Sequence, residues 1–386
     1  MLNVGFIGCG GIAHPHICAL RCLNEVNVVA AMDTDEAAAG VFASRYQIPI
    51  VTSDIEVLLG NREIDAVVIV TPSAFHAPLA SRALGAGKHV LVQKPPALHV
   101  DDLQSVASAQ AESGCVFMTS FFEMFHPAFV EARRLFREGA LGDVVLVRAN
   151  MSWGSPQEAG WRYSKEVAGG GIIADGQVHH LALYDWLFGV PRPARVFAAT
   201  SGGSDPLARH EVEHVASTTI TDAERVVELS GSHSISSGNQ QLTRPRGEWA
   251  SFYERIELFG TDGTVILAPS ERPSLTVFAP KLGGRQPISW SAPVLTSTPW
   301  DRRVNSMHFN SDEDPWVAMH EHFVNAIDQG VEPVSGLRFS FGVVSLLEAA
   351  YTAMRTGASV KVEAVAIGPH GLVNDADQTV TLTREN

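Results

Sequence analysis

A chain of 386 residues can bury a large core and exceeds the usual size of a single domain, so the length predicts two domains. The formal net charge of -14 argues against a nucleic-acid or anionic-membrane partner, and 45% hydrophobic with 18% charged residues is typical of a globular protein. The N-terminus lacks the basic start of a signal peptide, and no stretch reaches the roughly 20 apolar residues that span a bilayer. We therefore expect a cytoplasmic protein with no membrane partner, and its four cysteines, which show no paired framework, to be reduced thiols.

A glycine-rich turn follows the first apolar segment. Residues 4–7 predict a short buried strand, and Gly8, Gly10 and Ala13 of "GCGGIA" then form a G-x-G-x-x-A pattern. Gly8 would permit a tight turn, Gly10 would let the backbone approach a pyrophosphate, and Ala13 would keep the next helix close to the strand. The pattern predicts a dinucleotide site at the helix N-terminus, although an ordinary strand–turn–helix could also carry it.

A second predicted strand, Val26 to Met32, ends in Asp33. An acid at this distance from the glycines accepts hydrogen bonds from the ribose hydroxyls of NAD and repels the 2′-phosphate of NADP. Its neighbours Thr34 and Asp35 provide no arginine to hold such a phosphate. The sequence therefore favours NAD over NADP. Asp33 could also be the N-cap of the next helix, and the two roles are compatible.

Further short apolar segments alternate with helices, which predicts βαβ units and a doubly wound parallel sheet. These segments are residues 64–72, 88–95 and 115–121. Ligands of such sheets bind beyond the carboxyl ends of the strands. Ser73, Gln93, Lys94 and Phe122 fall near such ends and are expected to converge on the cofactor.

Beyond about residue 142 the pattern changes. Residues 195–294 show apolar–polar alternation, which predicts a mostly antiparallel sheet with a hairpin turn at Thr261–Gly263. Two helical segments, "DPWVAMHEHFVNAIDQG" and "RFSFGVVSLLEAAYTAMRTG", close the chain. We expect an NAD-binding domain at 1–125, a substrate-binding and oligomerisation domain at 126–365, and a poorly ordered tail at 366–386.

A second cluster with chemical potential is "GGGIIADGQVHHLALYDWLFG". Gly169–Gly171 would give a flexible lead-in to a helix on which Asp175 and His179, four residues apart, share one face. Aspartate can hold an imidazole tautomer, and histidine is the side chain best suited to accept a proton near neutral pH. With a lysine from the other domain the pair could transfer protons, or it could be a surface pair that only stabilises the helix. We expect no metal here, because there is no HExxH motif and no clear third ligand.

Together these motifs resemble the glucose–fructose oxidoreductase, inositol dehydrogenase and rhizopine catabolism (Gfo/Idh/MocA) family of NAD(P)-dependent oxidoreductases. The resemblance covers residues 3 to about 363 and rests on "GFIGCGGIA", "VTPSAFHAPLASRALGAGKHVLVQKP", "FREGALGDV", "GWR", the Asp175–His179 segment and "FGVVSLLEAAYTAMRTGASVKV" in this order. It implies an N-terminal Rossmann domain and a C-terminal α+β domain with a large open-faced sheet. The exposed sheet face would form a homodimer or homotetramer, and the last helices would pack on the first domain.

The resemblance also implies roles for single residues. Lys94 matches the lysine of the family's E-K-P motif, which hydrogen-bonds the reacting oxygen near the nicotinamide, and Asp175 and His179 match an acid–histidine pair whose histidine is the general base. The expected cofactor-binding residues are Gly8, Gly10, Gly11, Ile12, Asp33, Thr71, Pro72, Ser73, His76, Gln93 and Lys94. The expected substrate residues are Phe122, Trp161, Arg162 and His180. Trp161 and Arg162 could instead be structural, and His180 could simply cap a carbonyl.

Several residues depart from the family's pattern. Gln93 stands where the family usually has glutamate, and Ser73 replaces a frequent asparagine. Ala182 replaces a second aspartate, and Glu123 and Met124 stand where asparagine or arginine is frequent. The first two changes concern the cofactor side, whereas the others concern the substrate and could indicate an unusual one.

The resemblance implies a hydride transfer between nicotinamide and a ring alcohol or carbonyl of a sugar, sugar derivative or cyclitol. His179 would take the hydroxyl proton, Lys94 would polarise the oxygen, and Asp175 would orient His179. Two alternatives remain open. One is a glycosidase that uses NAD catalytically through oxidation, elimination, addition and reduction, and the other is a non-catalytic NAD-binding regulator.

Overall fold

The computed structural model of the protein describes residues 1–152, 160–189, 193–201, 211–233, 253–269, 274–280, 288–290, 314–362, 367–368 and 371–372. The chain forms two compact units. The first comprises Met1–Phe125, Leu295–Val344 and Ala366–Val373, and the second comprises His126–Val294, Ser345–Val365 and Asn374–Asn386. No helix among the described residues is long and apolar enough to cross a membrane.

The first unit contains a parallel sheet of six strands in the order β3-β2-β1-β4-β5-β6. The strands are β1 (Leu2–Ile7), β2 (Val26–Met32), β3 (Ile50–Thr52), β4 (Ala66–Ile69), β5 (His89–Gln93) and β6 (Phe117–Ser120). This is the predicted doubly wound sheet. Only β3 was missed, because a three-residue, half-buried edge strand has too little apolar periodicity to be recognised.

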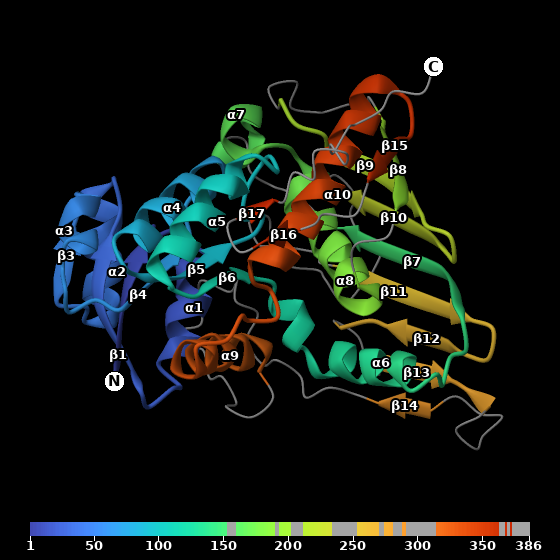
Figure 1. Ribbon diagram of the computed structural model, residues 1–386, viewed down its shortest axis with the longest axis horizontal. Helices are drawn as coiled ribbons and strands as arrows, with labels where there is room; N and C mark the ends of the chain where they lie inside the picture. The colour runs from blue at the N-terminus through green and yellow to red at the C-terminus, as the bar shows by residue number, and fades with distance from the viewer. Residues whose placement is uncertain are drawn as a thin grey trace, which may run out of the picture. The chain divides into compact units, whose positions relative to one another are not determined.

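Helices cover both faces of this sheet. They are α1 (Ala13–Leu20), α2 (Glu36–Tyr46), α3 (Ile55–Leu59), α4 (His76–Gly85), α5 (Asp102–Ser113), α9 (Pro315–Gln329) and the first part of α10 (Leu337–Thr356), with short 3-10 turns η1 (Ser73–Phe75) and η2 (Phe122–Phe125). Side chains of α1, α2 and α9 share a core cluster with Val4 and Phe6 of β1. Gly5 faces Leu58 of α3 on the other side, as the strand's period of two requires. Figure 1 shows α9 in orange beside α1.

The predicted tail begins with a small hairpin, β16 (Ile367–Gly368) and β17 (Gly371–Leu372), which belongs to the first unit. Residues 373–386 lie outside the described residues.

The second unit contains a nine-stranded sheet in the order β14-β13-β12-β11-β7-β10-β9-β8-β15. The strands are β7 (Val144–Ser152), β8 (Ala194–Thr200), β9 (Val215–Thr221), β10 (Val226–Ser232), β11 (Tyr253–Gly260), β12 (Thr264–Leu267), β13 (Leu275–Phe278), β14 (Ile288–Trp290) and β15 (Val360–Val362). Only the β7–β10 pair is parallel among these described strands. The predicted mostly antiparallel sheet, and with it the predicted fold class, is confirmed.

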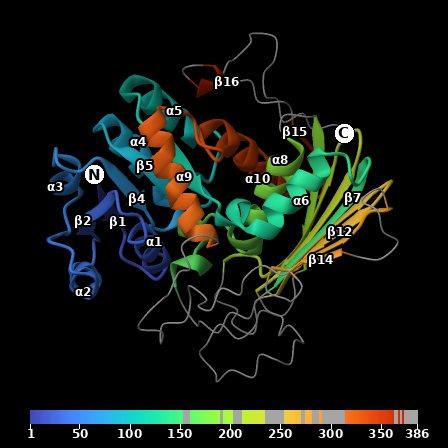
Figure 2. The same cartoon turned by 90° about the horizontal axis from the view of Figure 1, so that it is seen from below.

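The sheet of the second unit has one covered and one open face. Figure 2 shows α6 (Pro127–Arg137) and α8 (Val178–Phe188) along the covered face. On the open face Phe197, Val226 and Phe278 remain 42%, 38% and 42% exposed. The predicted turn at Thr261–Gly263 joins β11 to β12, and Gly260 N donates to Gly263 O at 2.8 Å.

Candidate cofactor and proton-transfer sites

The glycine turn after β1 is shaped by close backbone contact on one side and open space on the other. Gly8 has φ +97°, and a Cβ there would lie 2.9 Å from the carbonyl carbon and oxygen of Val70, so only glycine fits. Gly10 and Gly11 are exposed, and a Cβ on either would meet no atom within 4 Å. No side-chain cap covers the first turn of α1, where Ile12 is the N-cap residue. This arrangement fits a phosphate group held by backbone N–H groups.

The Asp33 carboxylate is tied to the glycine turn. Its Oδ2 accepts from Cys9 N at 2.8 Å, and its Oδ1 accepts from Asp35 N at 3.0 Å. Asp35, rather than Asp33, is the N-cap of α2, where it accepts from Ala37 N and Ala38 N, so the capping alternative for Asp33 is wrong. A carboxylate has about four acceptor positions, so two remain for ribose hydroxyls.

Two loops at the carboxyl ends of β4 and β5 are joined by His76. Its Nδ1 lies 2.7 Å from Pro95 O and its Nε2 lies 2.8 Å from Thr71 O. The ring is buried, and burial lowers the pKa of His76 although both carbonyls oppose this shift. A neutral ring carries one N–H, so it donates to one of these two backbone oxygens, and the tautomer decides which. His76 therefore supports the loop of Thr71, Pro72 and Ser73 from within the protein.

Gln93 is the last residue of β5, and Lys94 follows it. The buried Gln93 side chain accepts from Lys94 N through Oε1 at 3.1 Å, and its Nε2 lies 2.8 Å from His16 Nε2. Lys94 is half-buried at the same sheet edge as the glycine turn, because Ile7, Ile69 and Val92 are in register across β1, β4 and β5.

Phe122, an expected substrate residue, begins η2 after β6. Its half-buried ring stacks on Trp316 of α9 at 4.6 Å between centroids, with 15° between the planes. Its contact with substrate stays a prediction.

In the second unit, Asp175 and His179 lie where a π-helix meets an α-helix. The expected regular helix is wrong over Ile173–Gln177, which forms the π-helical turn labelled η4, and α8 begins at Val178. A π-helix has wider turns, so the α-helical spacing argument does not hold at Asp175. Among residues 171–188 every side chain is buried except those of Asp175 and His179. The two side chains named from the sequence are thus the two that solvent can reach.

The glycines before this turn allow close packing rather than flexibility. A Cβ on Gly170 would collide with the hydroxyl of Tyr351, and one on Gly171 would collide with the carbonyl oxygen of Glu213. Glu213 Oε1 accepts from Ile173 N at 3.0 Å and from the Tyr351 hydroxyl at 2.8 Å. That hydroxyl accepts from Ala174 N at 3.1 Å, and burial raises the pKa of Tyr351 well above its usual value. Side chains far away in sequence therefore bind the amides that open this helix.

The side chains of Arg162 and His233 face Asp175. Arg162 Nε lies 3.7 Å and His233 Nε2 lies 3.9 Å from its Oδ2. The Arg162 guanidinium stacks over the ring of Trp161, 4.5 Å from its centroid. Trp161 and Arg162 thus contact each other beside the predicted acid. His233, one residue beyond β10, was missed because a single histidine after a strand carries no pattern.

His180 is buried and contacts β11. It is 3% exposed, and its Nε2 lies 3.1 Å from Glu254 Oε1 on β11. Its partner is a carboxylate rather than a backbone carbonyl, and a role in substrate binding stays a prediction.

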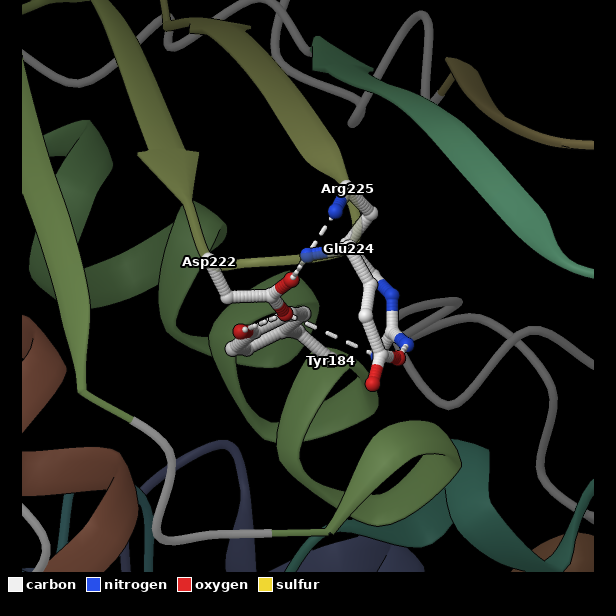
Figure 3. A network of polar contacts seen from close by, with 4 residues as sticks. All are labelled: Tyr184, Asp222, Glu224 and Arg225. Carbon is white, nitrogen blue, oxygen red and sulfur yellow. Dashed lines mark hydrogen bonds and ion pairs between the residues drawn. The ribbon is translucent and has the colours of Figure 1, made fainter.

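Polar and ring contacts link the C-terminal half of α8, the helix that carries His179, to the turn between β9 and β10. Figure 3 shows Tyr184 of α8 with the β9–β10 turn. The Tyr184 hydroxyl donates to Asp222 Oδ2 at 2.9 Å, and Asp222 Oδ1 accepts from Glu224 N and Arg225 N. The Arg225 guanidinium contacts Glu224, lies 3.6 Å from Asp222 and stacks 4.2 Å over Phe188. The Glu224 side chain is exposed, whereas those of Asp222 and Arg225 are buried, and their contacts resist sliding of α8 along the sheet.

Comparison with known proteins gives matches along most of the chain. A family model described as "Oxidoreductase family, NAD-binding Rossmann fold" matches residues 2–121, and one described as "GFO/IDH/MocA C-terminal domain" matches residues 129–266. Levoglucosan dehydrogenase of Pseudarthrobacter phenanthrenivorans is 24% identical over 382 residues, covering 93% of this chain and 90% of the relative. Inositol 2-dehydrogenase of Rhizobium meliloti is 27% identical over 272 residues, covering 70% and 77%.

The structure of a levoglucosan dehydrogenase in complex with NADH shares the fold. Its TM-score is 0.79 at 22% identity, and the match covers 94% of this chain and 100% of that one.

Proposed function

Because the chain belongs to the GFO/IDH/MocA family of oxidoreductases, we propose that it is an NAD-dependent dehydrogenase of a ring alcohol in a sugar, sugar derivative or cyclitol. The preference for NAD over NADP rests on the Asp33 carboxylate, which backbone N–H groups hold beside the glycine turn. The class of substrate rests on relatives named for levoglucosan and inositol.

The observation that carries the proposed chemistry is the exposure of Asp175 and His179 in an otherwise buried segment. A general base must reach the proton it removes, and in 171–188 only these two side chains reach the surface. Histidine is suited to accept the hydroxyl proton near neutral pH, and Lys94 supplies ammonium hydrogens for the alcohol oxygen.

Each side chain has one role in this proposal. Gly8, Gly10, Gly11 and Ile12 would hold the pyrophosphate of NAD, and Asp33 would hold its ribose. The bound cofactor would supply the acceptor for the hydride of the carbinol carbon. His179 takes the hydroxyl proton, and Lys94 hydrogen-bonds the oxygen that becomes a carbonyl.

Asp175 stabilises the imidazolium form of His179 in this scheme. The Arg162 guanidinium, whose Nε lies 3.7 Å from Asp175 Oδ2, balances the charge of this carboxylate, and His233 Nε2 lies 3.9 Å from the same oxygen. Trp161, against which Arg162 stacks, is suited to pack on a sugar ring.

We also propose that the open sheet face, with Phe197, Val226 and Phe278, pairs with a second copy of the chain. Large exposed apolar side chains on one face are typical of an interface.

Nicotinamide absorbance during incubation with NAD tests the reaction. Levoglucosan, myo-inositol, D-apiose and simple aldoses form the panel, and Lys94→Ala and His179→Ala are run beside the parent protein. We expect NADH from the parent and a loss of at least about a hundredfold in kcat for each variant. Unaltered turnover in both variants contradicts these roles. Cleavage of a glycoside with no net NADH would indicate the glycosidase instead.

A further inference from the structure

A buried chain of hydrogen bonds in the first unit runs from α9 to the backbone of Lys94. His320 Nδ1 lies 2.7 Å from the carbonyl oxygen of Trp316, and His320 Nε2 lies 2.9 Å from His16 Nδ1. His16 Nε2 lies 2.8 Å from Gln93 Nε2, and Gln93 Oε1 accepts from Lys94 N at 3.1 Å. Both histidines are fully buried, and Gln93 is 6% exposed.

The chemistry of the two ends fixes the direction of every bond. A carbonyl oxygen only accepts, so His320 carries its proton on Nδ1 and presents a lone pair at Nε2. His16 must then donate from Nδ1 and accept at Nε2, and the Gln93 amide donates to it. The remaining amide oxygen of Gln93 accepts the Lys94 N–H. Every polar atom in this series of hydrogen bonds has a partner when both rings are neutral.

Burial agrees with this assignment. It lowers the pKa of His16 well below its usual value, with the neighbouring His320 adding to the effect, and it lowers the pKa of His320 to about 4. Neutral rings are therefore the stable forms at physiological pH.

The same assignment of donors and acceptors explains why residue 93 is a glutamine. A glutamate could accept from Lys94 N, but its ionised carboxylate has no donor for His16 Nε2. It would need an additional proton, on the carboxyl group or on His16, inside a core that disfavours charge. The amide supplies both the donor and the acceptor without any charge.

We propose that His16 and His320 are positioning residues for Lys94 and act on it through Gln93. This proposal rests on the proposed function, in which Lys94 hydrogen-bonds the reacting oxygen. These hydrogen bonds join the backbone of Lys94 to α1 and α9. The next residue, Pro95, is contacted separately by His76 through its carbonyl oxygen. Loss of one anchor lets the lysine depart from the geometry that the reaction requires, and small displacements of reacting groups are costly to turnover.

The direction of the bonds is tested by NMR of protein labelled with ring-15N histidine. His16→Gln and His320→Gln assign the two signals. We expect both rings to be neutral with the proton on Nδ1, which is the less common tautomer of a free imidazole. A proton on Nε2 of either ring, or a charged ring at neutral pH, overturns the arrangement.

The positioning role is tested by kinetics with the panel compound that the protein oxidises. His320→Leu should lower kcat about tenfold while the Kd for NADH stays within about twofold. His322→Leu is the matched control, because His322 lies on the same helix but takes no part in these hydrogen bonds. Its Nε2 accepts from Val334 N at 3.0 Å. It should lower the melting temperature and leave kcat unchanged. If His320→Leu does not fold, His320→Phe replaces it, because a phenyl ring fills similar space and can make neither hydrogen bond.

A double-mutant cycle separates action through Gln93 from a general loss of packing. In a Gln93→Leu background, His320→Leu should lower kcat no further, since the link to Lys94 is already broken. Additive effects on kcat, or a His320→Leu variant that loses only thermal stability as His322→Leu does, overturn the proposal. If no compound yields NADH, the proposed function fails and the positioning role with it, whereas the measured tautomers still decide the hydrogen-bond arrangement.

Discussion

Replacing Asp33 with alanine should weaken NADH binding and remove most of the discrimination against NADPH. The carboxylate already accepts from Cys9 N at 2.8 Å and from Asp35 N at 3.0 Å, which leaves two acceptor positions for ribose hydroxyls. Hydrogen bonds to a charged group contribute about 1.5 kcal/mol each at the lower end of their range. Losing two such bonds corresponds to about 3 kcal/mol, or roughly 150-fold in Kd, and partial exposure to solvent should reduce the rise in the Kd for NADH to between about 10-fold and 100-fold.

The same change should improve NADPH binding relative to NADH. The 2′-phosphate carries about two negative charges and is repelled by a carboxylate in the position of Asp33. Fluorescence titration of Asp33→Ala with NADH and with NADPH measures both constants. In the variant, the ratio of the Kd for NADPH to the Kd for NADH should move toward one. In the parent protein, added salt should reduce the preference for NADH over NADPH.

A matched control separates binding from folding. Asp35→Ala removes a carboxylate from the same loop, and it should lower the unfolding free energy by about 1 kcal/mol because Asp35 caps α2. It should leave both dissociation constants unchanged. If Asp33→Ala binds NADH as tightly as the parent and loses only stability, Asp33 is a structural tie between the glycine turn and β2, and the argument for NAD is refuted.

Three further outcomes are expected. Burial and the nearby Asp33 raise the pKa of Cys9 to about 12, so its thiolate is scarce at pH 8. Mass spectrometry after brief iodoacetamide treatment should therefore find Cys9 unalkylated. Rapid labelling of Cys9 in the native protein would contradict this. Gly171→Ala should lower the unfolding free energy by roughly 3 kcal/mol, because its Cβ meets the rigid carbonyl of Glu213, and an unchanged melting temperature would show that the turn can yield. Phe197→Arg should shift the protein toward monomer in light scattering after size-exclusion chromatography, whereas a parent that is already monomeric excludes the open sheet face as an interface.

The sequence predicted those parts of the fold whose pattern is local. β2 spans Val26–Met32 as predicted, and the alternation beyond residue 195 became an antiparallel sheet with its turn at Thr261–Gly263. Periodicity and turn chemistry are properties of neighbouring residues, so one sequence contains them. β3 is too short to show either, and the N-cap of α2 shifted to Asp35 because two acids stand two positions apart at that helix start.

The geometry around Asp175 could not be predicted in the same way. The residues that bind the amides of Ile173 and Ala174 are Glu213 and Tyr351, which lie 40 and 177 positions away in sequence. Nothing near Asp175 indicates that a π-helix replaces an α-helix. His233, whose Nε2 lies 3.9 Å from Asp175, likewise comes from the end of another strand.

The support for Lys94 follows the same physical logic. Its motif is local, but its backbone is anchored through Gln93 to His16, 77 positions from Gln93, and through His16 to His320, 304 positions further. A motif shows which side chains face a ligand, because those side chains are adjacent in sequence to strand ends. The groups that hold such side chains in place need only be adjacent in space, so any pair of buried histidines in the sequence is an equal candidate until the fold is known. Gln93 needs both kinds of information. The sequence shows that a glutamine replaces the family's usual glutamate, and the structure shows the reason, because the neutral imidazole of His16 needs a hydrogen-bond donor.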